Sequence, residues 1–154
     1  MSSSSECIIG AAARACYCAR PLFDNQSTRA LEKSAAASLA PHTLMQRAGL
    51  ALAQLSLAVA PHAQTVWVAC GSGNNGGDGF EAAMHLQLWG KQVVVSCLDP
   101  LGPLPADALL SRTRALNAGV AIDTSPPAAF EACIDALFGI GTLRPLEGIY
   151  AAWI

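Results

Sequence analysis

The sequence predicts an α/β protein with a mainly parallel sheet that is covered by helices on both faces. Short β-branched, apolar runs alternate with helical patterns along most of the 154-residue chain. These runs are apolar at nearly every position, which is typical of parallel strands buried on both faces. The first run ends in glycines that lead directly into a helical pattern, as a βα turn does. We therefore predict three layers in the order α, β, α.

Length and composition indicate one domain. A chain of 154 residues can bury a sizeable core. Its net charge of −2 argues against an electrostatic grip on nucleic acid. No apolar stretch reaches the ~18 residues that a membrane-spanning helix needs. We therefore expect neither nucleic acid nor a membrane as a partner.

The cysteines favour a reducing compartment. The chain has six, and none forms a CxxC pair. Cys70 and Cys97 fall in predicted strands and Cys133 just before one, where a free thiol acts as a small buried hydrophobic group. We therefore expect reduced core cysteines in a cytoplasmic protein.

The first 23 residues differ from the rest. They contain a run of four serines, two arginines and one acidic residue, with no sustained periodicity. Serine-rich, acid-poor segments occur in cleaved targeting peptides, but this one has few arginines and no clear cleavage signal. We expect residues 1–23 to form a poorly ordered or variable extension and residues 24–154 to form the domain.

Two helices are predicted before the first strand. Asp24 or Asn25 can cap a helix that continues through an alanine-rich stretch and ends before Pro41. The second helix begins at Thr43, has apolar residues at three-to-four spacing, and ends before Pro61.

Strands and helices alternate in the rest of the chain. We predict strands at 65–70, 92–98, 120–123 and within 131–138, and helices at 79–89 and 104–118. Gly90 and Gly119 are expected to end the two helices.

The most informative segment is the loop 71–80, Gly-Ser-Gly-Asn-Asn-Gly-Gly-Asp-Gly-Phe. Glycines permit positive φ and a close approach of a ligand to the backbone. The helix that follows offers free N–H groups and a positive dipole end to an anion. Asn74, Asn75 and Asp78 are more than a plain phosphate loop needs, so we expect them to recognise a sugar, an amide or a metal ion.

One interpretation of this loop is dinucleotide binding. Residues 71–76 match G-x-G-x-x-G, and Asp99 follows about 20 residues later, where an acid can bind a ribose hydroxyl. This glycine pattern is a weak signal by itself, and two helices before the first strand depart from the usual dehydrogenase layout. An NAD-dependent oxidoreductase is therefore the alternative that the fewest residues support.

Four motifs in order make the chain resemble the NAD(P)H-hydrate epimerases, the YjeF N-terminal family. They are the segments 27–32, 44–49, 71–80 and 135–146. The resemblance runs from about Asp24 to the last residue and implies a Rossmann-like fold. It also implies an isomerase that repairs nicotinamide nucleotides by interconverting the R and S forms of hydrated NADH and NADPH. An ADP- or ATP-dependent dehydratase that accepts the S form would be a fused or separate partner.

The resemblance also implies the site residues. The substrate would contact Asn74, Asn75, Gly76, Gly77, Asp78, Gly139, Ile140, Gly141, Thr142, Leu143, Arg144 and Pro145. A potassium ion, K⁺, would be the cofactor, with Asn75 and Asp135 among its ligands. Amide and carboxylate oxygens suit a hard cation, and Arg144 has the fork geometry for a phosphate.

Asp78 is the candidate catalytic residue. Inverting the hydrated carbon requires loss and return of water, or ring opening, and a nearby carboxylate can move the proton. Asp78 is the only acid inside the loop. The alternative is a structural role as the cap of the helix that begins beside it, and the sequence leaves both roles open.

Other prominent side chains are expected to be structural. We predict solvated His42 and His62, a surface or packing role for His85, buried Trp67 and Trp89, and a solvated helix face with Arg112 and Arg114.

The resemblance predicts an incomplete C-terminal side. The family continues with further strands, one of which carries an Asp-Ile-Pro-Ser-Gly segment whose Asp contacts substrate and whose Ser completes the potassium site. This sequence ends at Trp153-Ile154. We therefore expect the 154-residue chain alone to be marginally stable and inactive. A nucleotide-binding module without catalysis is the second hypothesis, and the sequence leaves a homodimer open.

Overall fold

The computed structural model describes residues 22–140, 145 and 147–153. Its elements are α2 (Asn25–Ala36), α3 (Thr43–Val59), β1 (Thr65–Cys70), α4 (Asn74–Leu88), β2 (Gln92–Ser96), α5 (Ala106–Asn117), β3 (Ala121–Asp123), β4 (Ala132–Ala136) and α6 (Gly148–Trp153). Nearly all of the predicted extension 1–23 lies outside the described residues. No helix among the described residues is long and apolar enough to cross a membrane.

The four strands form one parallel sheet in the order β3-β2-β1-β4. Val68 in β1 pairs with Val95 in β2 on one side and with Ile134 in β4 on the other. After β1 the chain thus adds β2 and then β3 on one side of β1, and β4 then pairs with the other side of β1. Ligands of open α/β sheets bind at such a reversal of strand order. The predicted α/β fold is confirmed.

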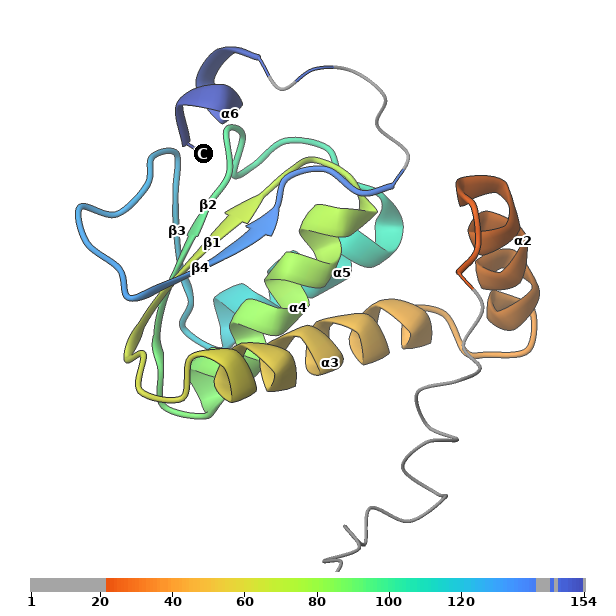
Figure 1. The fold of residues 1–154 in the computed structure, drawn as a ribbon, viewed down its shortest axis with the longest axis horizontal. Coiled ribbons are helices and arrows are strands. Elements are labelled where there is room, and N and C mark those ends of the chain that lie inside the picture. Colours follow the sequence, from red (N-terminus) through yellow and green to blue (C-terminus); the bar gives the residue numbers. More distant parts are fainter. Residues whose placement is uncertain (1–21, 141–144, 146, 154) are drawn as a thin grey trace, which may run out of the picture.

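The helices and the sheet form layers (Figure 1). α4 contacts β1, β2 and β4 on one face of the sheet and lies between α3 and α5. The core on this face includes Val66, Val68, Phe80, Leu86, Val95 and Ile134. The opposite face carries a smaller cluster around Trp67 and Trp153, to which α6 contributes. The rings of these two tryptophans are edge to face, with centroids 6.2 Å apart.

The helix after β1 begins earlier than predicted, at Asn74 and not at Gly79. Gly73 is its N-cap in an extended conformation, and its carbonyl accepts a hydrogen bond from Gly77 N at 3.1 Å. Asn and Gly have low helix propensity, but the glycines allow close packing here. A Cβ on Gly79 would lie 2.6 Å from Ala136 Cβ and 2.8 Å from Cys70 Sγ. This turn of α4 therefore packs directly on β1 and β4.

The glycine loop does not use the positive φ that its glycines permit. Among the described residues, the glycines with positive φ are Gly90, Gly119 and Gly148. The first two follow α4 and α5 with φ of +85°, so the predicted helix ends are confirmed. The glycines that follow β1 serve close packing, because a Cβ on Gly76 would collide with the carbonyl oxygen of Gly71.

Two burial predictions fail at the margins of the core. Trp67 is buried as predicted, but Trp89 is 42% exposed at the end of α4, where its ring lies 5.6 Å from that of His85. Cys70 and Cys97 are buried free thiols, whereas Cys133 is exposed within β4. β4 is an edge strand of the sheet, so its side chains have fewer covering neighbours.

Candidate functional site

A groove of about 1050 Å³ lies where the carboxyl ends of β1 and β4 meet the start of α4. Its described lining residues are Thr28, Arg29, Glu32, Ser72, Gly73, Asn74, Asn75, Asp78, Asp135, Leu137, Phe138, Gly139 and Ile140. Six of the predicted site residues are among them, although they come from two segments about 60 residues apart in sequence. Parallel strands whose carboxyl ends share one sheet edge bring these segments together.

The two loops of the groove are joined by backbone contacts. Gly71 N donates to the carbonyl of Ala136 at 3.0 Å. A Cβ on Gly71 would collide with the carbonyl of Leu137. The chain after β1 and the chain after β4 thus lie side by side, and only glycine fits at residue 71.

The start of α4 faces the groove with free backbone donors. Its N-cap, Gly73, makes no side-chain capping bond, and its first turn contains no acidic residue. The first N–H groups of a helix have no intrahelical partner and carry a partial positive charge. This end of the groove is therefore suited to an anion.

Asn75 and Asp135 place an amide and a carboxylate on the same groove. Asp135 is exposed, and its Oδ1 accepts a hydrogen bond from Leu137 N at 3.0 Å. Asn75 is half-buried beside Gly139, where an added Cβ would lie 3.4 Å from Asn75 Cβ. Among the described residues, no group of three or more His, Cys, Asp or Glu side chains could hold a metal ion. A potassium site built from one carboxylate, one amide and carbonyl oxygens would not be such a group, and its donor chemistry fits these residues.

Asp78 lies in the second turn of α4, is half-buried and lines the groove. The interpretation of Asp78 as a helix cap is wrong, because Gly73 is the N-cap. Burial raises the pKa of Asp78 from 3.8 to about 6, and the negative charge of Glu32 adds to the effect. A carboxyl group with this pKa can both donate and accept a proton near neutral pH.

The remaining predicted substrate contacts are placed differently. Gly76 and Gly77 are buried, and a Cβ on Gly77 would lie 2.6 Å from Met45 Sδ and 2.8 Å from Ala108 Cβ. Pro145 is exposed and does not line the groove. The predicted contacts at Gly141, Thr142, Leu143 and Arg144 lie outside the described residues.

The helix α2 contributes a wall of the groove that the sequence did not predict. Thr28, Arg29 and Glu32 of α2 line the groove. Asn25 Nδ2 donates to the carbonyl oxygen of Ile140 at 2.6 Å, which ties the start of α2 to the loop after β4. The motif 27–32 was part of the family resemblance, but no pattern in the sequence showed that this helix meets the glycine loop.

A second, smaller hollow of about 290 Å³ lies over the carboxyl ends of β1 and β2. Asp99 lines it together with Gly71 and Ser72, as the dinucleotide interpretation requires. Arg112 lines it too, is 8% exposed and donates from Nη1 to the carbonyl of Gly102 at 3.1 Å. The prediction of a solvated Arg112 is therefore wrong.

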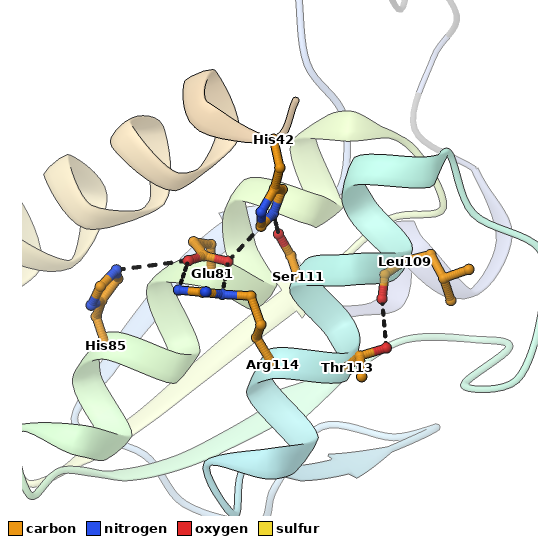
Figure 2. Close-up of polar contacts among 7 residues, drawn as sticks. All are labelled: His42, Glu81, His85, Leu109, Ser111, Thr113 and Arg114. Carbon is orange, nitrogen blue, oxygen red and sulfur yellow. Dashed lines mark hydrogen bonds and ion pairs between the residues drawn. The ribbon is translucent and has the colours of Figure 1, made fainter. Parts of the chain in front are cut away.

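Behind the groove, α4 carries a buried carboxylate that the sequence did not single out (Figure 2). Glu81 has 0% exposure, and Arg114 Nε donates to its Oε2 at 3.2 Å. His42 Nε2 lies 3.7 Å from the same oxygen and 2.8 Å from Ser111 Oγ. The expectation of a solvated His42 is wrong, because this side chain is buried among α3, α4 and α5. Arg114 keeps part of the predicted exposure, with 36% of its side chain exposed, while its guanidinium pairs with Glu81.

His62 and His85 agree with the sequence-based expectations. His62 is exposed, and His85 is half-buried with its Nε2 3.9 Å from Glu81 Oε1. Burial lowers the pKa of His85, although the charge of Glu81 opposes that shift.

Comparison with known proteins gives a consistent set of relatives. A family model described as "YjeF-related protein N-terminus" matches residues 41–154. An NAD(P)H-hydrate epimerase of Rhodopirellula baltica is 37% identical over 115 residues, which are 70% of this chain and 47% of that protein. An NAD(P)H-hydrate epimerase of Rhodobacter capsulatus is 34% identical over 146 residues, or 85% of this chain and 69% of that protein.

Longer relatives and a solved structure also match most of this chain. A bifunctional NAD(P)H-hydrate repair enzyme of Escherichia coli is 38% identical over 112 residues, which are 70% of this chain and 22% of that enzyme. The crystal structure of the yeast protein ynu0 superposes with a TM-score of 0.68 at 19% identity, covering 86% of this chain and 63% of that one. This chain thus spans about half the length, or less, of the first relatives it matches.

Proposed function

The chain belongs to the family of YjeF-related protein N-termini, and on that basis we propose that it carries the epimerase activity of NAD(P)H-hydrate repair. The substrate would be NADH or NADPH that has taken up water at the nicotinamide ring. The reaction would interconvert the R and S configurations at the hydrated carbon. Relatives named as NAD(P)H-hydrate epimerases support the proposal.

The observation that carries the proposal is the composition of the groove. Asn74, Asn75 and Asp78 from the start of α4 face Asp135 and Gly139 from the end of β4. The groove therefore combines an anion-binding helix end with amides, oxygen donors for a cation, and a carboxyl group of shifted pKa. A dinucleotide hydrate offers a matching set of groups, namely a diphosphate, ribose hydroxyls, a carboxamide and a hydroxylated ring.

Asp78 would move the proton. As an acid it protonates the departing hydroxyl group, so that the carbon–oxygen bond breaks, water leaves and the ring nitrogen shares the positive charge. As a base it then takes a proton from the water that adds to the opposite face, which restores the hydrate with inverted configuration. No oxidant or reductant is consumed, and the proton returns to Asp78. Its pKa of about 6 suits both steps near neutral pH.

We further propose that K⁺ binds to Asn75 and Asp135. Both side chains line the groove and offer oxygen atoms, the donors that hard cations prefer. A bound cation would also offset the negative charges of Asp135 and of the substrate phosphates. Its contribution would be to hold the substrate, while this chain's own carboxyl group moves the proton.

The expected partner is a dehydratase that accepts the S form. Related proteins from Thermofilum pendens and Escherichia coli are named as bifunctional NAD(P)H-hydrate repair enzymes. These names support the pairing of an epimerase with a dehydratase for this protein as well. We place the reaction in the cytoplasm, and the free thiols of Cys70, Cys97 and Cys133 are consistent with a reducing compartment.

Hydride transfer is the competing function, because Asp99 lines a hollow next to the glycine loop. One experiment separates the alternatives. The intact protein is incubated with pure R hydrate, and separately with NAD⁺ and common alcohols or hydroxy acids. Conversion of R hydrate to S hydrate, without reduction of NAD⁺, supports the epimerase. Reduction of NAD⁺ supports the oxidoreductase, and tight binding without either reaction supports a non-catalytic module.

A further inference from the structure

α2 presents opposite charges to the groove although it buries none of its own residues. Arg29 and Glu32 are three residues apart, so both lie on one face of the helix. Among the described residues, the guanidinium of Arg29 makes no ion pair or hydrogen bond. An isolated helix of 12 residues is marginal in water. Packing of apolar side chains therefore does not account for the position of this helix.

The charges of the groove are unevenly distributed. Its described lining includes three carboxylates, those of Glu32, Asp78 and Asp135, and Arg29 is the one cationic side chain among those residues. Another hollow, of about 560 Å³ and different from the one that Asp99 lines, adjoins the groove. It is also lined by Arg29, Glu32, Asn74 and Asp78. Arg29 therefore shares both hollows with Asn74, the first residue of α4. The cationic side chain and the first N–H groups of α4 therefore border the same hollows.

One polar contact fixes α2 over the groove. Asn25, at the start of the helix, donates to the carbonyl of Ile140 at 2.6 Å. The helix thereby spans from the chain after β4 to the start of α4, the two segments that carry the site. Arg29 follows Asn25 by about one turn and lines the groove.

We propose that α2 is the outer wall of the substrate site and that Arg29 binds the diphosphate of the substrate. This inference rests on the proposed function, since it assumes a dinucleotide hydrate as ligand. An arginine fork matches two phosphate oxygens, and no carboxylate of the described residues pairs with it. Glu32 on the same wall repels phosphate from the end near Asp78. The pair thus sets the direction of the ligand, with its phosphates at Arg29 and its nicotinamide ring at Asp78.

The test uses ADP-ribose, which carries the diphosphate but no nicotinamide ring, and the intact protein. Calorimetry gives its dissociation constant for the wild type, Arg29→Ala, Arg29→Lys and Lys33→Ala. Lys33 is the matched control, because it lies on α2 one turn further and lines the adjoining hollow but not the groove. We expect about 10-fold weaker binding for Arg29→Ala, a smaller loss for Arg29→Lys and less than a 2-fold change for Lys33→Ala.

Kinetics with R hydrate and helix content complete the test. We expect Arg29→Ala to raise KM about 10-fold with kcat changed less than 3-fold, because the phosphates do not react. Circular dichroism should show unchanged helix content in all variants. Equal ADP-ribose affinity and equal KM in the wild type and Arg29→Ala would overturn the inference while leaving epimerisation intact. Arg29-dependent binding of ADP-ribose by a protein that does not epimerise the hydrate would instead overturn the proposed function and retain the phosphate site.

Discussion

The buried carboxylate of Glu81 and the guanidinium of Arg114 join α4 to α5, with Oε1 2.8 Å from Nη2. Gly49 of α3 approaches the same side chain, and a Cβ there would overlap Glu81 Cβ. α4 begins with the groove residues and is held about two turns later by this ion pair and by His42. The cluster therefore fixes the helix that carries the proposed catalytic residue.

Arg114→Ala should destabilise the fold. Removing the guanidinium leaves a fully buried carboxylate whose remaining ion-pair partners among the described residues are His42 and His85. Breaking a buried pair costs about 3–5 kcal/mol, and because Arg114 is partly exposed we expect about 2–3 kcal/mol in urea unfolding. Arg47→Ala is the control, since Arg47 lines the hollow beside Glu81 but is exposed, and should change stability by about 0.5 kcal/mol or less. Equal stability of the two variants would contradict a structural role for the ion pair.

Gly76→Ala should disrupt the glycine loop. Its Cβ would collide with the backbone carbonyl of Gly71, which cannot rotate away. We expect a loss of more than about 2 kcal/mol in thermal or urea unfolding, in the range of overpacked sites. Gly73→Ala is matched to it, because a Cβ at Gly73 has no atom within 4 Å. We expect Gly73→Ala to lower the free energy of unfolding by about 1 kcal/mol or less, which is the difference between Gly and Ala at an N-cap. A well-folded Gly76→Ala protein would show that the loop is not held as described.

Asp78 should set the acid limb of the pH profile. Burial raises the pKa of Asp78 to about 6, so kcat/KM of epimerisation should change with an apparent pKa near 6, and Asp78→Asn should remove this limb. The change of the unfolding free energy with pH also has a defined sign. Between pH 3.8 and about 6 the folded protein binds more protons at Asp78 than the unfolded chain does, so this group makes stability fall as pH rises.

Unfolding of the wild type and Asp78→Asn at several pH values checks that sign. Asp78→Asn should gain stability relative to the wild type as pH rises from about 4 to 6, with no further gain above that range. A difference that stays constant across these pH values would contradict the raised pKa.

Potassium should stabilise the intact protein more than sodium. If Asn75 and Asp135 hold the ion, a K⁺ concentration of about 100 times its dissociation constant adds about 2.7 kcal/mol to the free energy of unfolding. This corresponds to a rise of several degrees in Tm. Asp135→Asn and Asn75→Ala should each remove most of the difference between K⁺ and Na⁺. Asp123→Asn is the control carboxylate, at the far edge of the sheet. Equal Tm values in the two salts would contradict the potassium proposal.

Much of the fold follows from local pattern. The six-residue run of β1 is bounded by glycine after Cys70, and its predicted limits are correct. The start of α4 was misplaced because Asn and Gly are poor helix formers, and only packing against Ala136 and Cys70 makes the glycines favourable there. Local propensity cannot contain that information, since Ala136 is far away in sequence.

Site prediction failed where distant helices meet. The groove residues on α4 and β4 were predicted from motifs, and the sheet brings them together. Burial of His42 depends on Ser111, its hydrogen-bond partner 69 residues later. Likewise, the place of Arg29 in the groove depends on how α2 docks, which neither periodicity nor spacing specifies.

Epimerisation of purified R hydrate by the intact protein is the most direct test of the proposed function. Chromatography follows the appearance of S hydrate with the wild type, Asp78→Asn and Asp107→Asn. Asp107 lines the adjoining hollow with Asp78 but not the groove, so it controls for loss of a carboxylate. We expect the wild type and Asp107→Asn to equilibrate the two forms at similar rates, and Asp78→Asn to be about 100-fold slower. A wild-type rate no faster than the spontaneous one, or an Asp78→Asn rate equal to that of the wild type, would contradict the account.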